Sequence, residues 1–337
     1  MSEALLRTLA QALAHLVTMV DTCDDDVLDP DTAVKWLEDS GHVLNQLSTE
    51  DQCRLTELFR QIALREPEGP WREALLRMPD GYGFDHDADE RHRRYCHEAE
   101  SQVGRFLQVV RDVDPATPVP TCPGWTFADL IKHHGTTHRW MAHLVRTGAM
   151  KRVRSRDVPL DLPPHPSGYQ DWLAGSAAAC LDTLRAAPPE MPMWTHGADR
   201  HVRFWPRRLL FEAVVHRADA ELVLGREPDI GAETAIDGID EFLENLPHLS
   251  DATWAGEPVS VRLCSGDGDA AWTVTFGGGD FAWRRSRDET LATATVRATS
   301  SSDLLLLVYG RYKPEADRFT VTGDRAALDR WLSATAL

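Results

Sequence analysis

The chain of 337 residues is 42% hydrophobic and 26% charged, which fits two or three globular domains and excludes a peptide-sized or disulfide-stapled scaffold. Its net charge of −17, without a basic stripe, argues against nucleic acid as a partner. It also lacks a signal peptide, a long apolar segment and any paired cysteine spacing, so we expect a cytoplasmic protein with free thiols and no membrane contact.

The first quarter of the chain carries most of the negative charge. Residues 1–90 hold 20 of the 53 acidic residues but only 7 of the 36 basic ones, so −13 of the total charge of −17 lies there. This asymmetry predicts a separate unit. Only four of the basic residues are lysines, a bias that we attribute to a GC-rich genome rather than to function.

Helical periodicity and helix-start signals divide this acidic unit into four helices. They are expected over 3–20, from Pro30, from Ser48 or Thr49, and over 71–78. The Gly- and Asp-rich stretch 80–93 then has the composition of a linker. We therefore expect an acidic helical extension over 1–79, and none of its residues forms a recognisable catalytic pattern.

Four more helices are predicted between residues 94 and 250. Apolar residues recur with helical spacing over 94–113, from Thr126, over 169–186 and over 207–224. Four helices with long connections are typical of a bundle, whose facing interior positions often hold metal ligands. We expect a four-helix bundle over 94–250.

The pattern changes after about Asp251. Short β-branched or alternating segments between Gly-rich turns predict the strands of an antiparallel sheet, over 259–263, 271–276, 281–285, 292–298 and 318–322. Two short helices are expected over 303–310 and 324–333. The expected fold class is therefore α+β multidomain, with a C-terminal α+β domain over 251–337.

Histidine is concentrated in the predicted bundle. His133, His134 and His138 share one predicted helix, and Glu212 and His216 lie one turn apart on another. One imidazole from the first helix would complete a two-His, one-carboxylate metal set with open positions. A Glu-x-x-x-His pair alone is usually a solvated ion pair, so the prediction depends on the neighbouring histidines. A helical wheel puts His134 and His138 in the middle of the apolar stripe and His133 on its flank, which leaves the choice open.

Several ordered motifs carry a family resemblance. They are Val119–Thr126, His133–Trp140, Met193–Arg200 with Phe204–Arg208, and Glu212–Glu221. These stretches resemble the mycothiol-dependent maleylpyruvate isomerase family of the DinB-like four-helix metalloprotein superfamily. Asp237–Leu243 continues the likeness, and Thr295–Trp331 is similar to the family's C-terminal sterol-carrier-like domain. The resemblance covers about residues 94–337.

The resemblance implies a set of metal ligands. In the family the first ligand is the His eight residues after the Trp of the Gly-Trp-Thr motif, which is His133 here, and the other two correspond to Glu212 and His216. Most members carry an apolar residue where His134 stands, and His134 or His138 remains the alternative to His133. The implied metal is zinc, although two histidines and a carboxylate also suit other divalent metals.

The resemblance further implies mycothiol, the low-molecular-weight thiol of actinobacteria. A thiol bound to a divalent cation is deprotonated near neutral pH and becomes a nucleophile. Addition of the thiolate to an electron-poor C=C bond, rotation and expulsion of the thiolate would give cis–trans isomerisation, whereas retention of the adduct would give S-transfer. We expect an enzyme of one of these two kinds, acting on a small electrophilic metabolite.

A carboxylate substrate needs cationic partners, and Arg203 and Arg208 beside the ligand helix are candidates for a bidentate clamp. The alternative is that these arginines neutralise neighbouring surface acids. Asp219, three residues after His216, is a candidate acceptor for an imidazole N–H. Cys122 precedes a proline in a turn and is expected in a structural role.

The rival interpretation is a non-enzymatic protein. In this case the bundle binds a ligand or a metal, and the acidic region 1–90 docks a protein partner. A bound metal with an open position facing an Arg-lined cleft would favour the enzyme. Trp125 and Trp140 are expected in the bundle core rather than at a cofactor.

Overall fold

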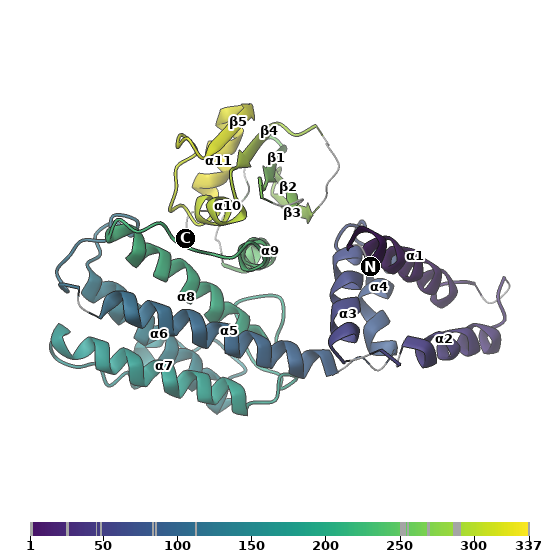
Figure 1. Cartoon of the computed structure of the whole chain (residues 1–337), viewed down its shortest axis with the longest axis horizontal. Helices are drawn as coiled ribbons and strands as arrows, with labels where there is room; N and C mark the ends of the chain where they lie inside the picture. The colour runs from purple at the N-terminus through teal and green to yellow at the C-terminus, as the bar shows by residue number, and fades with distance from the viewer. Residues whose placement is uncertain are drawn as a thin grey trace. The chain divides into compact units, whose positions relative to one another are not determined.

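The computed structural model describes residues 3–24, 27–44, 46–47, 49–82, 84, 86–111, 113–249, 254, 256–267, 270–285 and 291–335. The chain divides into two compact units, Met1–Arg91 and His92–Leu337, whose elements are labelled in Figure 1. None of the helices in the described ranges combines the length with the apolar character that crossing a bilayer requires.

The first unit is helical and has a core of its own. Its helices are α1 (Glu3–Asp21), α2 (Pro30–Leu44), α3 (Thr49–Ala63) and α4 (Pro70–Gly81). They confirm the four predicted helices, and Pro30 and Thr49 stand at the first helical positions. Ala14, Phe59 and Leu75 are fully buried in the core that α1, α3 and α4 share.

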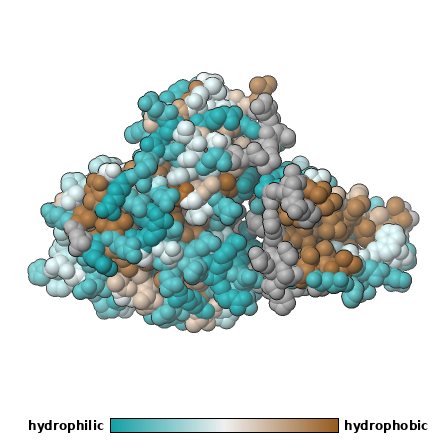
Figure 2. All heavy atoms as spheres, viewed as in Figure 1, coloured by the Kyte–Doolittle hydropathy of each residue, from teal (hydrophilic) through white to brown (hydrophobic). Residues whose placement is uncertain are grey.

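Apolar side chains also lie on the outer surface of this unit. Leu5, Leu9, Leu16 and Met19 are each about half exposed and form one stripe along α1. Figure 2 shows hydrophobic surface in brown over this part of the molecule. Exposed apolar patches are typical of interaction surfaces, so a protein partner for residues 1–90 stays a prediction.

The linker expected over 80–93 is largely helical instead. α4 ends at Gly81, and α5 (His86–Val110) already begins within this stretch. Asp89 and Glu90 lie near the start of α5, where the positive end of the helix dipole favours carboxylates. The acidic composition that is typical of a linker is therefore equally suitable for the N-terminus of a helix.

A truncated protein that begins near Arg91 should fold and keep any bound metal. Contacts within the chain cluster separately before and after this residue. His92 is buried in the second unit, where its Nε2 lies 2.7 Å from the main-chain oxygen of Leu184, so it must be retained. Circular dichroism and elemental analysis check this prediction. Aggregation or loss of metal would show instead that the extension completes the bundle's core.

The bundle of the second unit consists of α5, α6 (Phe127–Thr147), α7 (Tyr169–Ala186) and α8 (Phe204–Val223). Thr126 caps α6 in a capping box with Asp129, and Gly148 ends α6 in the left-handed conformation with φ of 55°. Two short 3₁₀ turns, Ser155–Asp157 and Pro166–Gly168, lie in the loop before α7. Most of α8 is buried, so its polar side chains require partners inside the protein.

A further helix, α9 (Ala232–Leu249), was not predicted from the sequence. Ile239, Phe242 and Leu246 are buried, and α9 contacts both α8 and α10 (Ser301–Val308). Asp240 and Glu241 are also buried on this helix. Both acids lie outside the stripe that the apolar residues form, so α9 is buried on more than its apolar side.

The C-terminal domain is a five-stranded sheet with two helices. The strands are β1 (Val259–Cys264), β2 (Ala271–Gly277), β3 (Asp280–Arg285), β4 (Ala294–Ala298) and β5 (Phe319–Gly323), and the helices are α10 and α11 (Arg325–Ala334). The strand order is β3-β2-β1-β4-β5. β1 and β4 are parallel, with Val261 opposite Ala294, so the expectation of an antiparallel sheet is wrong for this pair. Side-chain alternation reports the two faces of a strand but not the direction of its neighbour.

One hydrophobic core runs from the bundle into the C-terminal domain. It includes Phe211 of α8, Phe242 of α9, Trp272 of β2 and Leu305 of α10. A Cβ atom at Gly238 of α9 would lie 2.9 Å from the ring of Phe211 and 3.0 Å from Leu305, so this close packing requires glycine. The shared core fixes the end of α10 relative to α8. The structure confirms the α+β multidomain fold class.

Candidate metal centre

α6 and α8 bring three ligand-type side chains together. Nε2 of His133 lies 2.8 Å from Oε1 of Glu212, and Nε2 of His216 lies 3.4 Å from the same oxygen. One ligand atom from each residue lies within 4.8 Å of the other two. The side chains of Glu212 and His216 are 14% and 10% exposed, whereas that of His133 is 37% exposed. The cluster is therefore open to ligands on the side of His133.

This arrangement fits a divalent metal ion. Two ligand atoms of a tetrahedral zinc ion are ~3.3–3.6 Å apart, because each lies about 2.0–2.2 Å from the metal. The distance from the Glu212 oxygen to His216, 3.4 Å, lies in this range, and the distance to His133, 2.8 Å, is that of a hydrogen bond, which a metal ion would lengthen. Two imidazoles and a carboxylate suit zinc and other divalent metals alike.

The charges around Glu212 keep its carboxylate ionised. Burial raises the pKa of this carboxyl, but the Arg208 guanidinium and hydrogen bonds from His133 and His216 outweigh burial and hold the pKa well below its usual value. Nη2 of Arg208 donates to Oε2 of Glu212 at 2.6 Å, so Oε1 is left for the two imidazoles. Burial lowers the pKa of His216, but hydrogen bonds with Asp219 and other neighbours raise it well above the usual value. A metal ion would therefore replace a proton at this imidazole.

Asp219 orients His216 from the side opposite Glu212. Nδ1 of His216 lies 2.9 Å from Oδ2 of Asp219, and Arg311 donates to both oxygens of Asp219 at 2.9 Å. Burial raises the pKa of Asp219, but these two partners lower it below its usual range. With Nδ1 directed at Asp219, Nε2 of His216 faces the ligand cluster. The structure thus brings Asp219 to the imidazole for which the sequence makes it a candidate acceptor.

Cys122 forms a second possible ligand group with His216 and Asp219. Its Sγ lies 3.4 Å from Oδ2 of Asp219 and 3.8 Å from a guanidinium nitrogen of Arg311. Arg311 donates to both oxygens of Asp219, so a metal ion in this group would have to displace it, whereas Arg208 leaves Oε1 of Glu212 without a guanidinium partner. We therefore favour the group around Glu212. Cys122, expected in a purely structural role, instead lies at the edge of the site.

The two alternative histidines turn toward each other. Nδ1 of His134 lies 3.1 Å from Nε2 of His138, and the His134 ring stacks on Phe106 with ring centroids 4.5 Å apart. Both side chains are fully buried, which lowers the pKa of His138 to about 4 and that of His134 well below its usual value. The helical wheel is therefore correct in placing both in the core. The structure brings His133, on the flank of the stripe, to Glu212.

Arg203 and Arg208 both contact carboxylates of the chain itself. Arg208 is buried and bridges Glu212 at 2.6 Å and Glu241 at 2.9 Å. Arg203 is about one third exposed; its Nε donates to Asp199 at 2.7 Å and its Nη1 donates to Glu190. Arg208 therefore holds Glu212, a residue of the candidate ligand cluster, whereas Arg203 lies nearer the surface.

Trp125 lies against two of the ligands rather than within the bundle core. Its ring centroid is 5.0 Å from that of His133 and 6.2 Å from that of His216, and its plane is tilted by 23° from the His216 ring. The residue is partly exposed. Trp125 therefore covers one side of the two imidazoles.

Comparison with known families identifies the second unit. The model of the mycothiol maleylpyruvate isomerase N-terminal domain matches residues 96–221, and the model of the family's C-terminal domain matches residues 233–330. The chain belongs to the mycothiol-dependent maleylpyruvate isomerase family. The matched ranges contain His133, Glu212, His216, Cys122 and Arg311, and they leave the acidic extension outside.

Solved structures of the mycothiol-dependent maleylpyruvate isomerase are among those similar to this chain. The crystal structure of that enzyme is 15% identical, covers 68% of this chain and 92% of its own, and has a TM-score of 0.47. A histidine-to-alanine mutant of the enzyme is 14% identical, with the same coverage and TM-score. No curated protein matches the chain.

In this member of the maleylpyruvate isomerase family, Arg311 lies at the site although the sequence analysis did not predict it there. Arg311 and Asp219 are 92 residues apart, and their contact depends on the packing of the C-terminal domain on α8. Arg311 does lie within Thr295–Trp331, one of the stretches that carry the family resemblance. That resemblance is the signal that could have pointed to it, because no local spacing links it to the histidines.

Proposed function

We propose that this family member is a metal-dependent enzyme that uses mycothiol for cis–trans isomerisation or S-transfer on a small electrophilic metabolite. The observation that carries the proposal is the convergence of His133, Glu212 and His216 on one point that is open on the His133 side. Membership of the mycothiol-dependent maleylpyruvate isomerase family supports mycothiol as the thiol.

His133, Glu212 and His216 would hold the metal, for which zinc is the proposed ion. When bound, such an ion lowers the pKa of a coordinated thiol, so that the nucleophilic thiolate is present near neutral pH. Two of the chain's own thiols are unsuited to this role. Burial raises the pKa of Cys96 to about 11 and that of Cys180 to about 12, so both are protonated at neutral pH. These values favour an external thiol over either cysteine.

The surrounding side chains would keep the three ligands in place. Asp219 accepts a hydrogen bond from His216, and Arg311 in turn fixes Asp219. Arg208 holds Oε2 of Glu212 and stabilises its negative charge. Because neither arginine touches the three ligand atoms themselves, both are positioning residues in this proposal.

A substrate that carries a carboxylate needs a cationic side chain that is accessible from solvent. We propose Arg203 for this contact, because its side chain is about one third exposed and both its present partners, Asp199 and Glu190, are accessible to solvent. Arg208 is 9% exposed and lies between two carboxylates. Arg203→Ala should therefore weaken substrate binding more than metal binding.

Turnover should require both an added thiol and the metal. Mass spectrometry of candidate electrophiles incubated with the protein and mycothiol should detect an isomer or an S-adduct. Chelation of the metal should abolish either product even with excess thiol, because a free thiol with a pKa of about 8.5 is mostly protonated at neutral pH. Replacement of Cys122 or of Cys180 by alanine should keep the activity, since neither thiol belongs to the proposed metal set.

Three outcomes would contradict this account. Full turnover without added thiol, in protein shown to carry none from purification, would eliminate mycothiol. An unchanged rate after chelation would eliminate the metal. The absence of both isomer and adduct with every electrophile would favour the non-enzymatic binding protein.

A further inference from the structure

A pocket lies along the line of contact between α6 and α8, here called the seam. It is two helical turns from the proposed metal ligands. His133 contacts Glu212 at one end of the seam. Trp140, seven residues later on α6, contacts Trp205, seven residues earlier on α8, with ring centroids 5.4 Å apart. The two helices are therefore antiparallel along the seam. Seven residues of helix rise by ~10 Å, which sets the distance between the ligand cluster and this pair of rings.

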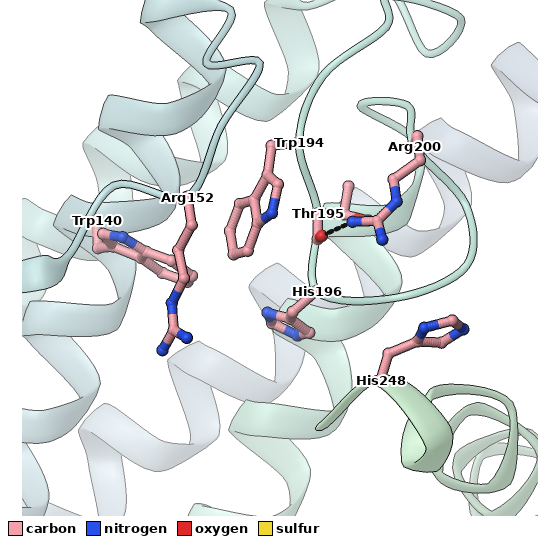
Figure 3. A pocket seen from close by; sticks show the side chains of 7 residues that line it. All are labelled: Trp140, Arg152, Trp194, Thr195, His196, Arg200 and His248. Atoms are coloured by element: carbon pink, nitrogen blue, oxygen red, sulfur yellow. Dashed lines mark hydrogen bonds between the residues drawn. The ribbon is translucent and has the colours of Figure 1, made fainter. Parts of the chain in front are cut away.

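The pocket has a volume of about 380 Å³, which is within the range of small-molecule sites. Figure 3 shows its side chains, which come from α6, the adjoining loops and the end of α9. The most informative of them are Trp140, Arg152, Trp194, His196, Arg200 and His248. None of the described residues that line the pocket is acidic.

Aromatic rings form one part of the pocket. The rings of Trp140 and His196 are parallel within 2°, with centroids 6.3 Å apart, and Trp194 is edge-on to both. Trp205 is fully buried and packs against all three rings. The indole N–H of Trp140 donates to the main-chain oxygen of Val153 at 2.8 Å, which fixes that ring. Burial lowers the pKa of His196 to about 3, so its imidazole is an uncharged flat surface at neutral pH.

Two guanidinium groups give the pocket its positive charge. Within the part of the chain that the structure describes, neither Arg152 nor Arg200 contacts a carboxylate, and Arg200 donates to the main-chain oxygen of Thr195. The neighbouring Arg203 and Arg208 are by contrast paired with carboxylates. In a protein with a net charge of −17, two arginines without acidic partners at one pocket indicate a site for an anion.

We propose that this pocket binds a flat organic anion, an aromatic carboxylate. Its ring would lie against Trp140 and Trp194, and its carboxylate would accept charge-assisted hydrogen bonds from Arg152. Arg200, on the other side of Trp194, would add positive charge to the pocket (Figure 3).

Isothermal titration calorimetry of the purified full chain tests the site with three probes. Benzoate has a flat ring and a charge, benzamide has the ring without the charge, and cyclohexanecarboxylate has the charge without the flat ring. We expect benzoate to bind one site per chain, at least tenfold more tightly than either of the others. Equal affinity for benzoate and benzamide, or for benzoate and cyclohexanecarboxylate, would overturn the proposal.

Replacement of each guanidinium tests the charge directly. Arg152→Ala should weaken benzoate binding about tenfold, because it removes a charge-assisted hydrogen bond. Arg200→Ala should weaken it less, because it removes only the more distant positive charge. Arg154→Ala is the matched control, since Arg154 follows in the same loop but pairs with Asp157 at 3.5 Å. Benzoate affinity that is unchanged in both pocket variants would contradict the assignment.

A metal-ligand variant separates this proposal from the proposed function. In His133→Ala, benzoate affinity should stay within twofold of the wild-type value, because the ligand cluster lies two turns from the pocket. Loss of benzoate binding in this variant would mean that benzoate binds the metal, and the pocket proposal would fail. Benzoate binding as expected, without any thiol-dependent turnover, would leave the pocket proposal standing and the proposed function rejected.

Discussion

Glu212→Ala should reduce the metal content of the purified protein from about one ion per chain to near zero. Oε1 of Glu212 is the atom that both His133 and His216 approach, at 2.8 and 3.4 Å. Without this carboxylate, two imidazoles and the nearby Arg208 cation remain, which is a poor environment for a divalent metal. Thiol-dependent turnover should be lost with the metal.

Elemental analysis of histidine variants completes this test. His133→Ala and His216→Ala should also lose the metal, whereas His143→Ala, which changes another histidine of α6, is the matched control and should retain it. If His133→Ala is the only one of the three ligand variants that keeps the metal, the ligand from α6 is His134 or His138 instead of His133. Full metal in both Glu212→Ala and His216→Ala would place the site elsewhere in the chain.

Arg208→Ala should destabilise the second unit by about 3–5 kcal/mol, the usual cost of leaving a buried charge without its partner. The Arg208 side chain is 9% exposed and its partner Glu241 is 2% exposed, so solvent cannot replace the lost guanidinium. Glu212 would lose its partner in the same variant. Chemical denaturation of the metal-free protein measures the change without a contribution from metal binding.

Arg203→Ala provides the comparison for this stability effect. Arg203 and its partner Asp199 are each 34% exposed, its other partner Glu190 is 62% exposed, and ion pairs of this kind each contribute about 1 kcal/mol or less. The loss of stability in Arg208→Ala should therefore exceed that in Arg203→Ala severalfold. Equal losses would show that the contacts of Arg208 with Glu212 and Glu241 are not a buried network in solution.

Local sequence signals account for most of the fold. The periodicity of α1 and the capping box of Thr126 and Asp129 predict helices close to where they occur, because these signals act within one or two turns. α9 was not predicted although its apolar residues have helical spacing. Its acids Asp240 and Glu241 lie outside this stripe and are buried because Trp272 and Arg208 bond to them, which no local signal predicts. The parallel pairing of β1 with β4 was missed because it joins strands separated by an intervening hairpin.

The candidate site shows the same limit on sequence reasoning. The one-turn spacing of Glu212 and His216 follows directly from helix geometry. Periodicity places His134 and His138 correctly in the core, but only the family motif points to His133, whose partial exposure leaves the ligand cluster open to small molecules. The contact of Arg311 with Asp219 depends on the packing of two domains and has no local sequence signal.

The central claim is that a metal ion is held by His133, Glu212 and His216 rather than by the group that contains Cys122. Zinc-edge X-ray absorption spectroscopy of the zinc-loaded protein, freed of small thiols, distinguishes the two groups by ligand type. The account predicts nitrogen and oxygen ligands alone, at about 2.0–2.2 Å from the metal. A sulfur ligand at about 2.3 Å would place the metal at Cys122 and contradict the account.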